Sequence, residues 1–152
     1  MLTQKQVKRQ FSYNKKTGIL KWKIGIRKGK NVGCLDERGY IQTVINNKKT
    51  YIHRLIWLYV YGEFPKKEID HINRIKDDNR ICNLRDVSRQ INNYNHGLNK
   101  NNKSGYKGVR WNKKCNKWAS FIGINNKLIH LSCFKLIKDA IKARKRAELK
   151  YW

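Results

Sequence analysis

The first third of the chain alternates apolar and polar residues in short runs bounded by turn-forming residues. The run "ILKWKI" follows the segment "NKKTG", and "RGYIQTVINNKKTYIH" places two alternating runs around an Asn-Asn pair. Alternation of this kind is typical of half-buried β-strands, and such Asn- and Gly-containing segments favour tight turns. Residues 11–52 are therefore predicted to form short antiparallel strands joined by hairpins.

The pattern changes to a helical period in "IHRLIWLYVYG", residues 52–62, where apolar side chains recur at i, i+3, i+4 and i+7. The glycine that closes this run and Pro65 shortly after it are typical of a helix end. We therefore expect a short helix here.

Short extended runs return in residues 66–95. "EIDHIN" is predicted to be the end of a strand, "RIKDDNRIC" a polar loop and "NLRDVS" a second short strand. Ser88 is a favourable N-cap for a helix running through "RQINNYN". The stretch therefore predicts a unit of strand, loop, strand and helix.

The last third repeats the strand pattern after a polar break. "HGLNKNNKSG" has no apolar periodicity and is predicted to be a linker. The runs "KGVRWNK", "KWASFIGIN" and "KLIHLSCF" read as strands, and "LIKDAIKARKRAELKYW" as a basic helix. The apolar stripe of that helix comprises Ile137, Ala140, Ile141, Ala143 and Ala147. A three-stranded antiparallel sheet with one packed helix satisfies these patterns.

Together these elements predict an α+β protein with two domains. The expected boundaries are an N-terminal domain at residues 1–95, a linker at 96–104 and a C-terminal domain at 105–152.

Charge identifies the class of partner. Thirty-six Lys and Arg against ten Asp and Glu give a formal net charge of +26, spread along the whole chain, which is typical of a protein that binds a polyanion. Six of the ten acidic residues lie between residues 63 and 86. In this arrangement the basic flanks can bind phosphates and the short acidic centre can bind a cation.

An anionic membrane is the competing partner, but the first residues, "MLTQKQVKRQF", have neither an apolar core nor a myristoylation pattern. No apolar run has the length of a transmembrane helix. We therefore expect a cytoplasmic, monomeric protein that binds double-stranded DNA and has no membrane or small-molecule partner.

The four cysteines are Cys34, Cys82, Cys115 and Cys133. They are widely spaced and form no C-x-x-C pair, so a zinc knot is not expected, and reduced thiols are predicted.

The acidic centre contains the candidate chemistry. Hydrolysis of a phosphodiester needs a base to activate water and positive charge near the phosphoryl oxygens and the departing oxygen. An imidazole and a hard divalent cation can meet both needs, and such a cation takes carboxylate and carboxamide oxygens. Asp70, His71 and an Asn of the following helix supply these groups. Adjacent strand residues point to opposite faces, so Asp70 and His71 can share a site only where the strand ends or bends.

The segment "IDHINRIKDDNRICNLRDVSRQINNYN" resembles the core of phage and intron-encoded HNH endonucleases. The resemblance implies a ββα-metal fold with one Mg²⁺ or Mn²⁺ per active site. It makes Asp70 a metal ligand, His71 the general base and Asn83 the residue that braces the loop. Asn92 falls where the wider family often has His, and would be the second ligand of an H-N-N variant.

Neighbouring side chains leave the helix ligand open, because Asn93, Asn95 and His96 are alternatives to Asn92. Asn79 is expected to be a loop-forming residue, and His53 to pack. Arg80 and Arg85 are candidate DNA contacts.

Residues 104–149 resemble the three-stranded DNA-binding domain of ethylene-response-type transcription factors. The motifs are "GVRWNK", "KWASFI", the strand ending in Phe134 and the Ala-rich helix. By position, the implied DNA contacts are Arg110, Trp111, Lys113, Lys117 and Trp118. Arg110 and Trp111 alternate along one strand, so a regular strand cannot present both to DNA.

The sequence thus predicts a metal-dependent DNA endonuclease of phage or homing type, cutting one strand or both. A DNA-binding protein without catalysis is the alternative. An RNA-binding protein is a second rival, favoured by charge but lacking "GFGF"-type and G-x-x-G signatures.

Overall fold

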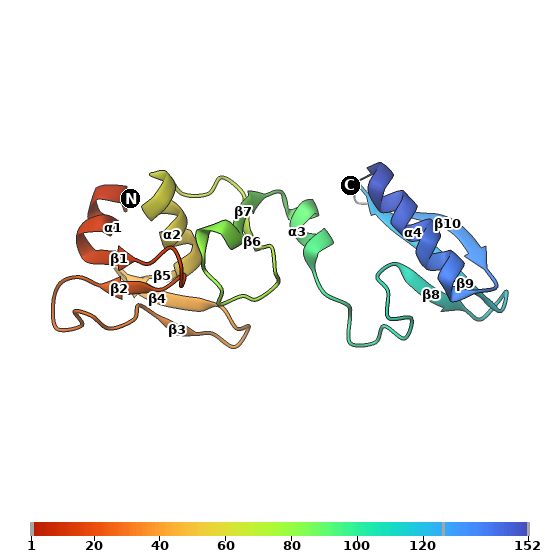
Figure 1. Cartoon of the computed structure of the whole chain (residues 1–152), viewed down its shortest axis with the longest axis horizontal. Helices are drawn as coiled ribbons and strands as arrows, with labels where there is room; N and C mark the ends of the chain where they lie inside the picture. The colour runs from red at the N-terminus through yellow and green to blue at the C-terminus, as the bar shows by residue number, and fades with distance from the viewer. Residues whose placement is uncertain (1, 126, 152) are drawn as a thin grey trace. The chain divides into compact units, whose positions relative to one another are not determined.

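A computed structural model describes residues 2–125 and 127–151. The chain divides into two compact units, residues 1–95 and residues 96–152, each of which is described by itself (Figure 1). Small antiparallel sheets and packed helices make up both units, so the predicted α+β class is confirmed. Within the part of the chain that the structure describes, no helix combines the length and apolar character needed to cross a membrane.

The first unit begins with a helix that the sequence patterns did not predict, α1 (Gln4–Gln10). Thr3 and Gln6 form a capping box at its start, in which each side chain bonds to the other residue's backbone N–H. Val7 is the one residue of α1 that is buried. A helix anchored by a single apolar side chain leaves no periodic stripe in the sequence, which explains why it was missed.

Two small sheets follow α1. The first pairs β1 (Phe11–Tyr13) with β2 (Leu20–Trp22), and the second contains β3 (Cys34–Leu35), β4 (Ile41–Ile45) and β5 (Lys48–Tyr51) in that order. Asn46 and Asn47 have φ of 50° and 61° between β4 and β5. Two left-handed residues are what a tight two-residue hairpin needs, so the predicted hairpins are confirmed.

The helix predicted from residue 52 is α2 (Ile52–Tyr61), which ends at Gly62 in the left-handed conformation. Its apolar face lies at the centre of the core of this unit. That core comprises Val7, Phe11, Leu20, Val32, Ile52, Leu55, Ile56, Leu58, Ile69 and Leu84.

The last part of the first unit has the predicted order of strand, loop, strand and helix. It consists of β6 (Glu68–His71), the 3₁₀ turn η1 (Ile81–Asn83), β7 (Leu84–Val87) and α3 (Arg89–Asn95). β6 and β7 are antiparallel, with Asp70 opposite Arg85. The Ser88 hydroxyl accepts from Ile91 N at 3.4 Å, in keeping with its predicted role as an N-cap.

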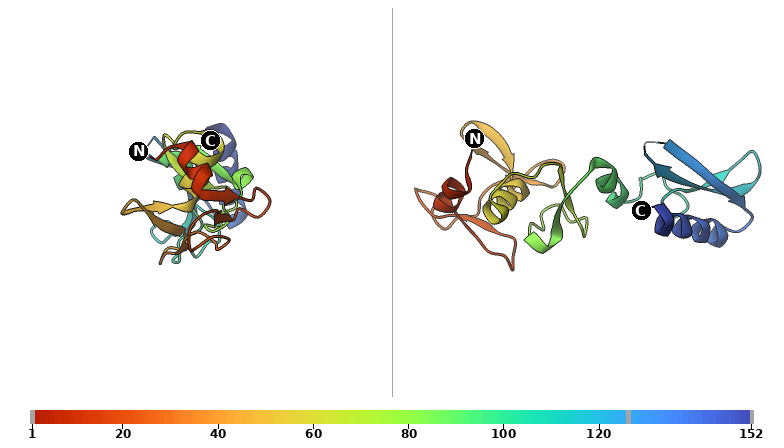
Figure 2. Two further views of the ribbon diagram at one scale, coloured as in Figure 1. Left: turned by 90° about the vertical axis from the view of Figure 1, so that its left-hand side faces the viewer. Right: turned by 90° about the horizontal axis from the view of Figure 1, so that it is seen from above.

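The second unit is a three-stranded antiparallel sheet with one helix packed against it (Figure 2). Its elements are β8 (Val109–Asn112), β9 (Lys117–Ile124), β10 (Lys127–Phe134) and α4 (Ile137–Tyr151), with β9 in the middle. The buried residues of α4 are Ala140, Arg144 and Ala147. Arg144 is buried on the apolar side because its guanidinium bonds to the carbonyl oxygen of Phe121 and to Glu148.

Candidate active site

The imidazole of His71 lies at the end of β6 and is held by a buried carboxamide. His71 Nε2 lies 3.1 Å from Oδ1 of Asn79, whose side chain is 1% exposed. Asn79 Nδ2 donates to the carbonyl oxygen of Asp77 at 3.2 Å, which turns Oδ1 toward the imidazole. An amide oxygen can only accept, so this network assigns the hydrogen to Nε2 and leaves Nδ1 as the basic nitrogen of the neutral ring.

Asn79 is therefore a candidate site residue that the sequence did not reveal. The sequence predicts a loop-forming residue there, because an Asn between Asp and Arg in a polar run has the composition of an ordinary turn. The near-complete burial that reveals its role depends on tertiary contacts.

His71 is neutral near pH 7. Burial lowers the pKa of its imidazole below the ordinary value, although the Asn79 hydrogen bond and the Asp70, Asp77 and Asp78 carboxylates act in the opposite direction. A general base must be unprotonated to accept a proton, so burial keeps the ring in the useful form.

Two aromatic rings from outside β6, His53 of α2 and Tyr40 of the turn between β3 and β4, pack against His71. The ring centroids of His53 and Tyr40 lie 5.3 and 5.8 Å from that of His71, and Tyr51 stacks on His53 at 5.2 Å. His53 is 7% exposed. Burial, with a smaller contribution from the neighbouring His71, lowers the pKa of His53 to about 3. His53 thus packs as predicted, and it does so as a neutral ring against the candidate base.

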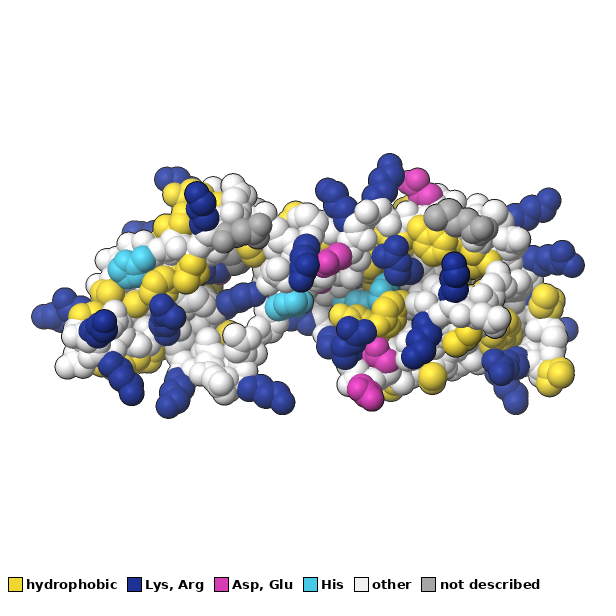
Figure 3. Space-filling view, turned by 180° about the vertical axis from the view of Figure 1, so that it is seen from behind, with side chains coloured by type: hydrophobic (Ala, Val, Ile, Leu, Met, Phe, Trp, Pro, Cys, Tyr) yellow, Lys and Arg dark blue, Asp and Glu magenta, His cyan; other side chains and the backbone are white. Residues whose placement is uncertain are grey.

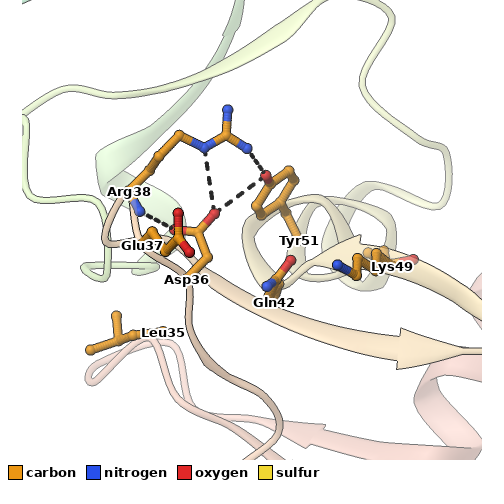
Figure 4. A pocket seen from close by; sticks show the side chains of 8 residues that line it. Leu35, Asp36, Glu37, Arg38, Gln42, Lys49 and Tyr51 are labelled. Carbon is orange, nitrogen blue, oxygen red and sulfur yellow. Dashed lines mark hydrogen bonds and ion pairs between the residues drawn. The ribbon is translucent and has the colours of Figure 1, made fainter.

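The turn between β3 and β4 contacts the aromatic rings around His71. Arg38 bonds to the Tyr51 hydroxyl and pairs with Asp36, and these three residues line a pocket of about 560 Å³ (Figure 4). Lys76, in the loop that follows β6, donates to the carbonyl oxygen of Arg38 at 2.8 Å and lies 5.0 Å from the centre of the Tyr40 ring. The loop after His71 is therefore tied to the second sheet.

Asn83 bridges the two ends of that loop. Its Oδ1 accepts from Asn73 N at 2.9 Å, and its Nδ2 donates to the Asp78 carbonyl oxygen at 2.8 Å. The backbone carbonyl of Asn83 also accepts from Ile72 N at 2.9 Å. These contacts are the ones that a loop brace would make.

The β1–β2 hairpin supports the same loop from outside. The Tyr13 hydroxyl donates to the Asn79 carbonyl oxygen at 3.0 Å and accepts from Ile81 N at 2.8 Å. Gly18, with φ of 74°, lies so close that a Cβ added there would meet Arg80 N at 2.6 Å. A side chain at Gly18 would push the hairpin away from the peptide that follows Asn79.

Asp70 faces the opposite side of β6 from His71, toward α3. Its carboxylate is 5% exposed and pairs with Arg85 on β7, with Oδ2 2.7 and 2.8 Å from two guanidinium nitrogens. Asp70 Oδ1 accepts from Asn95 Nδ2 at 2.8 Å. That same Nδ2 lies 2.7 and 3.4 Å from the carbonyl oxygens of His71 and Ile72. Because β6 ends at His71, the carboxylate and the imidazole can flank one site, as the sequence required.

Asn92 occupies the neighbouring position on α3. Its Nδ2 donates to Glu68 Oε2 at 2.8 Å, and Glu68 lies on the same face of β6 as Asp70. The structure thus brings Asn92 and Asn95 to the carboxylate side of β6, with Asn95 in contact with Asp70. Sequence reasoning did not identify Glu68, although its spacing of two residues from Asp70 on a strand was a readable signal.

This side of β6 suits a hard divalent cation. Among residues 2–125 and 127–151, no three His, Cys, Asp or Glu side chains are arranged to hold a metal. The oxygens on this side are the Asp70 and Glu68 carboxylates and the backbone carbonyls of His71 and Ile72, and Asn92 and Asn95 direct their amide nitrogens toward them. Mg²⁺ and Mn²⁺ prefer oxygen ligands and keep several waters, so this donor set fits the ion that the sequence predicted.

The remaining helix alternatives have different places. Asn93 lies on α3 between the two Asn residues that face β6, and His96 follows the helix, in the unit that begins at residue 96.

Of the candidate DNA contacts in the first unit, Arg80 pairs with Asp78 at 2.6 Å, and this pairing lowers the pKa of Asp78 to about 2. Arg80 and Arg85 thus each have a carboxylate partner in the structure.

The sheet of the second unit separates the predicted DNA contacts onto two faces. Directly paired residues of antiparallel strands share a face, so buried Val109 and Ser120 mark the face that α4 covers. The opposite face, called here the open face, comprises Arg110, Lys117, Ala119, Phe121, His130 and Cys133. The Arg110 guanidinium lies 4.3 Å from the centre of the Phe121 ring on this face.

Trp111 and Trp118 lie on the α4 side, with ring centroids 5.2 Å apart. Arg110 therefore lies on the open face and Trp111 on the opposite face, where Trp111 is still 45% exposed. Lys113 lies in the turn between β8 and β9. On the face drawn in Figure 3, Lys and Arg side chains are scattered over both units and acidic side chains are few.

Comparison with known proteins identifies the central segment. Residues 50–94 match the family model described as HNH endonuclease, a stretch that runs from β5 into α3. Among solved structures, the chain is similar to one described as "DNA binding and cleavage by the HNH homing endonuclease I-HmuI". The identity is 20% and the TM-score 0.43, over 93% of this chain and 82% of that chain. No curated protein matches the chain. The family match confirms the predicted HNH endonuclease segment and, with it, the predicted enzyme class, a DNA endonuclease.

Proposed function

We propose that the chain is a metal-dependent endonuclease that hydrolyses phosphodiester bonds of double-stranded DNA, with His71 as general base. The observation that carries the proposal is the hydrogen bond between Asn79 Oδ1 and His71 Nε2, 3.1 Å long and buried. It supports a neutral imidazole whose Nδ1 is the nitrogen that accepts a proton from water.

Asp70 and Asn92 are the proposed ligands of one Mg²⁺ or Mn²⁺. Asn92 uses Nδ2 for Glu68, and this orientation supports Oδ1 as a ligand atom. Asn95 is proposed as a positioning residue, because its Nδ2 bonds to Asp70 and to the backbone at the end of β6 while its Oδ1 accepts from Arg74 Nε at 3.2 Å. When bound, the ion supplies positive charge at the phosphoryl oxygens and at the departing 3′ oxygen.

The reaction follows from these roles. His71 Nδ1 takes a proton from a water molecule as the water oxygen attacks phosphorus. The bond from phosphorus to the 3′ oxygen breaks, and the departing 3′ oxygen takes up a proton from solvent. The hydrogen bond to Asn79 and the His53 and Tyr40 rings keep the imidazole oriented during proton transfer. Asn83 keeps the loop that carries Asn79 closed on β6. The expected products carry a 5′ phosphate and a 3′ hydroxyl, as the family resemblance implies.

The second unit is proposed to bind the same DNA through its open face. Arg110, Lys113 and Lys117 are the candidate contacts to phosphate, and they predict an affinity that falls steeply with salt. The resemblance to ethylene-response-type domains supports this assignment. Trp118 is half-buried against Trp111, which is itself 45% exposed on the other face.

The resemblance to phage and intron-encoded enzymes supports a phage or homing role in the cytoplasm of a host cell. We also propose a monomer as the catalytic unit, because all the proposed active-site residues lie in one compact unit, residues 1–95. Light scattering of the protein during cleavage tests the monomer.

The decisive experiment is cleavage of supercoiled plasmid and of phage and host genomic DNA by purified protein in Mg²⁺ or in EDTA, with His71→Ala alongside. Metal-dependent nicking or linearisation by the wild type, lost by about 10²-fold or more in His71→Ala, is expected because general-base catalysis has that magnitude. DNA binding by His71→Ala must stay intact. Tight binding without cleavage of any substrate would instead support the non-catalytic DNA-binding protein.

A further inference from the structure

Two cysteines that are 18 residues apart in the sequence lie side by side in the second unit. Cys115 Sγ, in the turn between β8 and β9, lies 3.9 Å from Cys133 Sγ on β10. Both are free thiols, and Cys115 is exposed to solvent. No sequence motif indicates this proximity, since the spacing matches no common two-cysteine motif.

A histidine completes the cluster. His130 Nε2 lies 3.4 Å from Cys133 Sγ, and the His130 ring packs against Phe121 with centroids 5.0 Å apart. The ladder pairs His130 with Phe121 and Cys133 with Ala119, so both side chains project from the open face. An imidazole in contact with a thiol can take its proton and generate a thiolate.

The two thiols have different surroundings. Cys115 lies in an exposed turn that an external disulfide can reach, whereas Cys133 on β10 is only partly exposed. Burial raises the pKa of Cys133, and the neighbouring Cys115 raises it further. Cys115 is therefore the thiol that reacts first with an external oxidant, and Cys133 is the thiol that resolves the product.

We propose that Cys115 and Cys133 are a modification site, a thiol pair that closes to a reversible disulfide by exchange with a low-molecular-weight disulfide such as oxidised glutathione. In the first step the Cys115 thiolate attacks one glutathione sulfur, forming a mixed disulfide and releasing one glutathione thiolate. In the second step His130 Nε2 takes the Cys133 proton, and Cys133 Sγ attacks Cys115 Sγ and releases the second glutathione. The protein loses two electrons and two protons, and one oxidised glutathione becomes two reduced ones.

The geometry needs little rearrangement. A disulfide bond is ~2.05 Å long, so the two sulfurs must approach by roughly 2 Å, which side-chain rotation and a small shift of the turn can supply. Cys115 is in a turn and not in the ladder, and the register of β10 already shifts between His130 and Ser132. The flanking backbone can therefore adapt without loss of the sheet.

The bond would fix the turn that carries Lys113 and Lys114 to the edge strand of the sheet. Cys133, Ala119 and Arg110 form one row across the open face. If the open face binds DNA as proposed above, bound DNA will shield the pair from oxidation. Formation of the disulfide itself does not rest on that function.

The test uses the whole chain, equilibrated without DNA in mixtures of oxidised and reduced glutathione, then blocked with N-ethylmaleimide and digested with trypsin. The expected product joins peptide 115–117, "CNK", to peptide 128–135, "LIHLSCFK", while Cys34 and Cys82 remain alkylated. Dithiothreitol must restore both thiols. The matched control is the double variant Cys34→Ser/Cys82→Ser, which keeps the pair and must give the same linked peptide.

Two variants separate the steps. Cys133→Ser should stop at the mixed disulfide on Cys115. His130→Gln should slow closure roughly tenfold, so that the mixed disulfide accumulates, because the proton acceptor is lost. The proposal is overturned if glutathione adds to Cys115 in the wild type while Cys133 stays alkylated, or if linked peptides join Cys34 or Cys82 as often. Because the readout is covalent mass, it is independent of DNA cleavage, and a chain without nuclease activity would leave this proposal intact.

Discussion

The two sides of β6 solve different problems with the same kinds of residue. On the His71 side, the imidazole is enclosed by Asn79, His53 and Tyr40, and the hydrogen-bond network fixes one tautomer. On the Asp70 side, the carboxylate is paired with Arg85 and Asn95, partners that a cation would have to replace or rearrange. These contacts orient the proposed base, whereas the proposed ligand Asp70 is stabilised by charged and polar partners until an ion binds.

The comparison teaches that carboxamides carry out opposite tasks at one site. Asn79 accepts from His71, while Asn95 donates to Asp70 and to backbone carbonyls. An Asn→Asp substitution removes the donor and keeps an acceptor, so its effect should depend on which side of β6 it is made.

The largest effect is expected at Asn79. Asn79→Ala leaves His71 Nε2–H buried without its acceptor and frees the tautomer, so cleavage should fall about 10²-fold or more. Asn79→Asp keeps an acceptor but adds a negative charge beside the ring, which raises the pKa of His71. A protonated base is inactive, so the rising limb of the rate against pH should move to higher pH. Single-turnover cleavage from pH 5 to 9 measures both, and an unchanged rate and profile in Asn79→Ala would remove Asn79 from the mechanism.

The next effect distinguishes Asn92 from Asn95. Asn92→Asp adds a negative charge to a proposed metal ligand. Cleavage should persist, or should need a lower Mg²⁺ concentration. Asn95→Asp replaces the Nδ2 donor with an oxygen that repels Asp70 and the His71 carbonyl, and should weaken metal binding about 10- to 100-fold. Titration of activity with Mg²⁺ and with Mn²⁺ compares the two, with Asn93→Asp as the matched control on the same helix. If Asn92→Asp weakens metal binding and Asn95→Asp does not, Asn95 is the ligand, an alternative that the sequence left open.

Local signals were enough to predict most of the fold. The helix from residue 52, the helix after Ser88 and the three strands of the second unit each have a periodic pattern with a cap or turn residue at its end. α1 has no such pattern, since Val7 is its one buried residue. Propensity and period cannot reveal a helix whose anchor is a single side chain.

The candidate site likewise contains residues that the sequence could identify and residues that it could not. Asp70, His71, Asn83 and Asn92 lie in a short segment whose order and spacing are distinctive, and residues 50–94 match the HNH endonuclease model. Asn79 could not be assigned, because its role comes from burial under the β1–β2 hairpin. The approach of Cys115 to Cys133 depends likewise on the register of β9 with β10. Such contacts join distant segments and leave no local pattern.

His53 offers a test of how burial on the His71 side affects stability. Its pKa is about 3 in the folded chain and about 6.5 when unfolded. The unfolded state therefore binds more protons below pH 6.5, so stability is lost as pH falls from 6.5 toward 3. His53 accounts for about 2 kcal/mol of the loss expected by pH 5. His53→Phe keeps an aromatic ring and should reduce the loss by that amount in urea unfolding at pH 7 and pH 5. His130→Phe, on the exposed sheet, is the control, and equal pH dependence in wild type and His53→Phe would contradict a buried neutral His53.

The smallest effect concerns the hairpin that supports the Asn79 loop. Tyr13→Phe removes the hydroxyl that bridges the Asn79 carbonyl and Ile81 N–H, which should lower the free energy of unfolding by about 1–2 kcal/mol. Tyr61→Phe is the matched control, because Tyr61 is exposed and packs through its ring against Trp57. If the loop orients His71 through Asn79, Tyr13→Phe should also slow cleavage several-fold at saturating Mg²⁺ without changing the metal requirement. A change in metal requirement with an unchanged maximal rate would mean that the hairpin acts on the Asp70 side instead, and that the two sides of β6 are not independent.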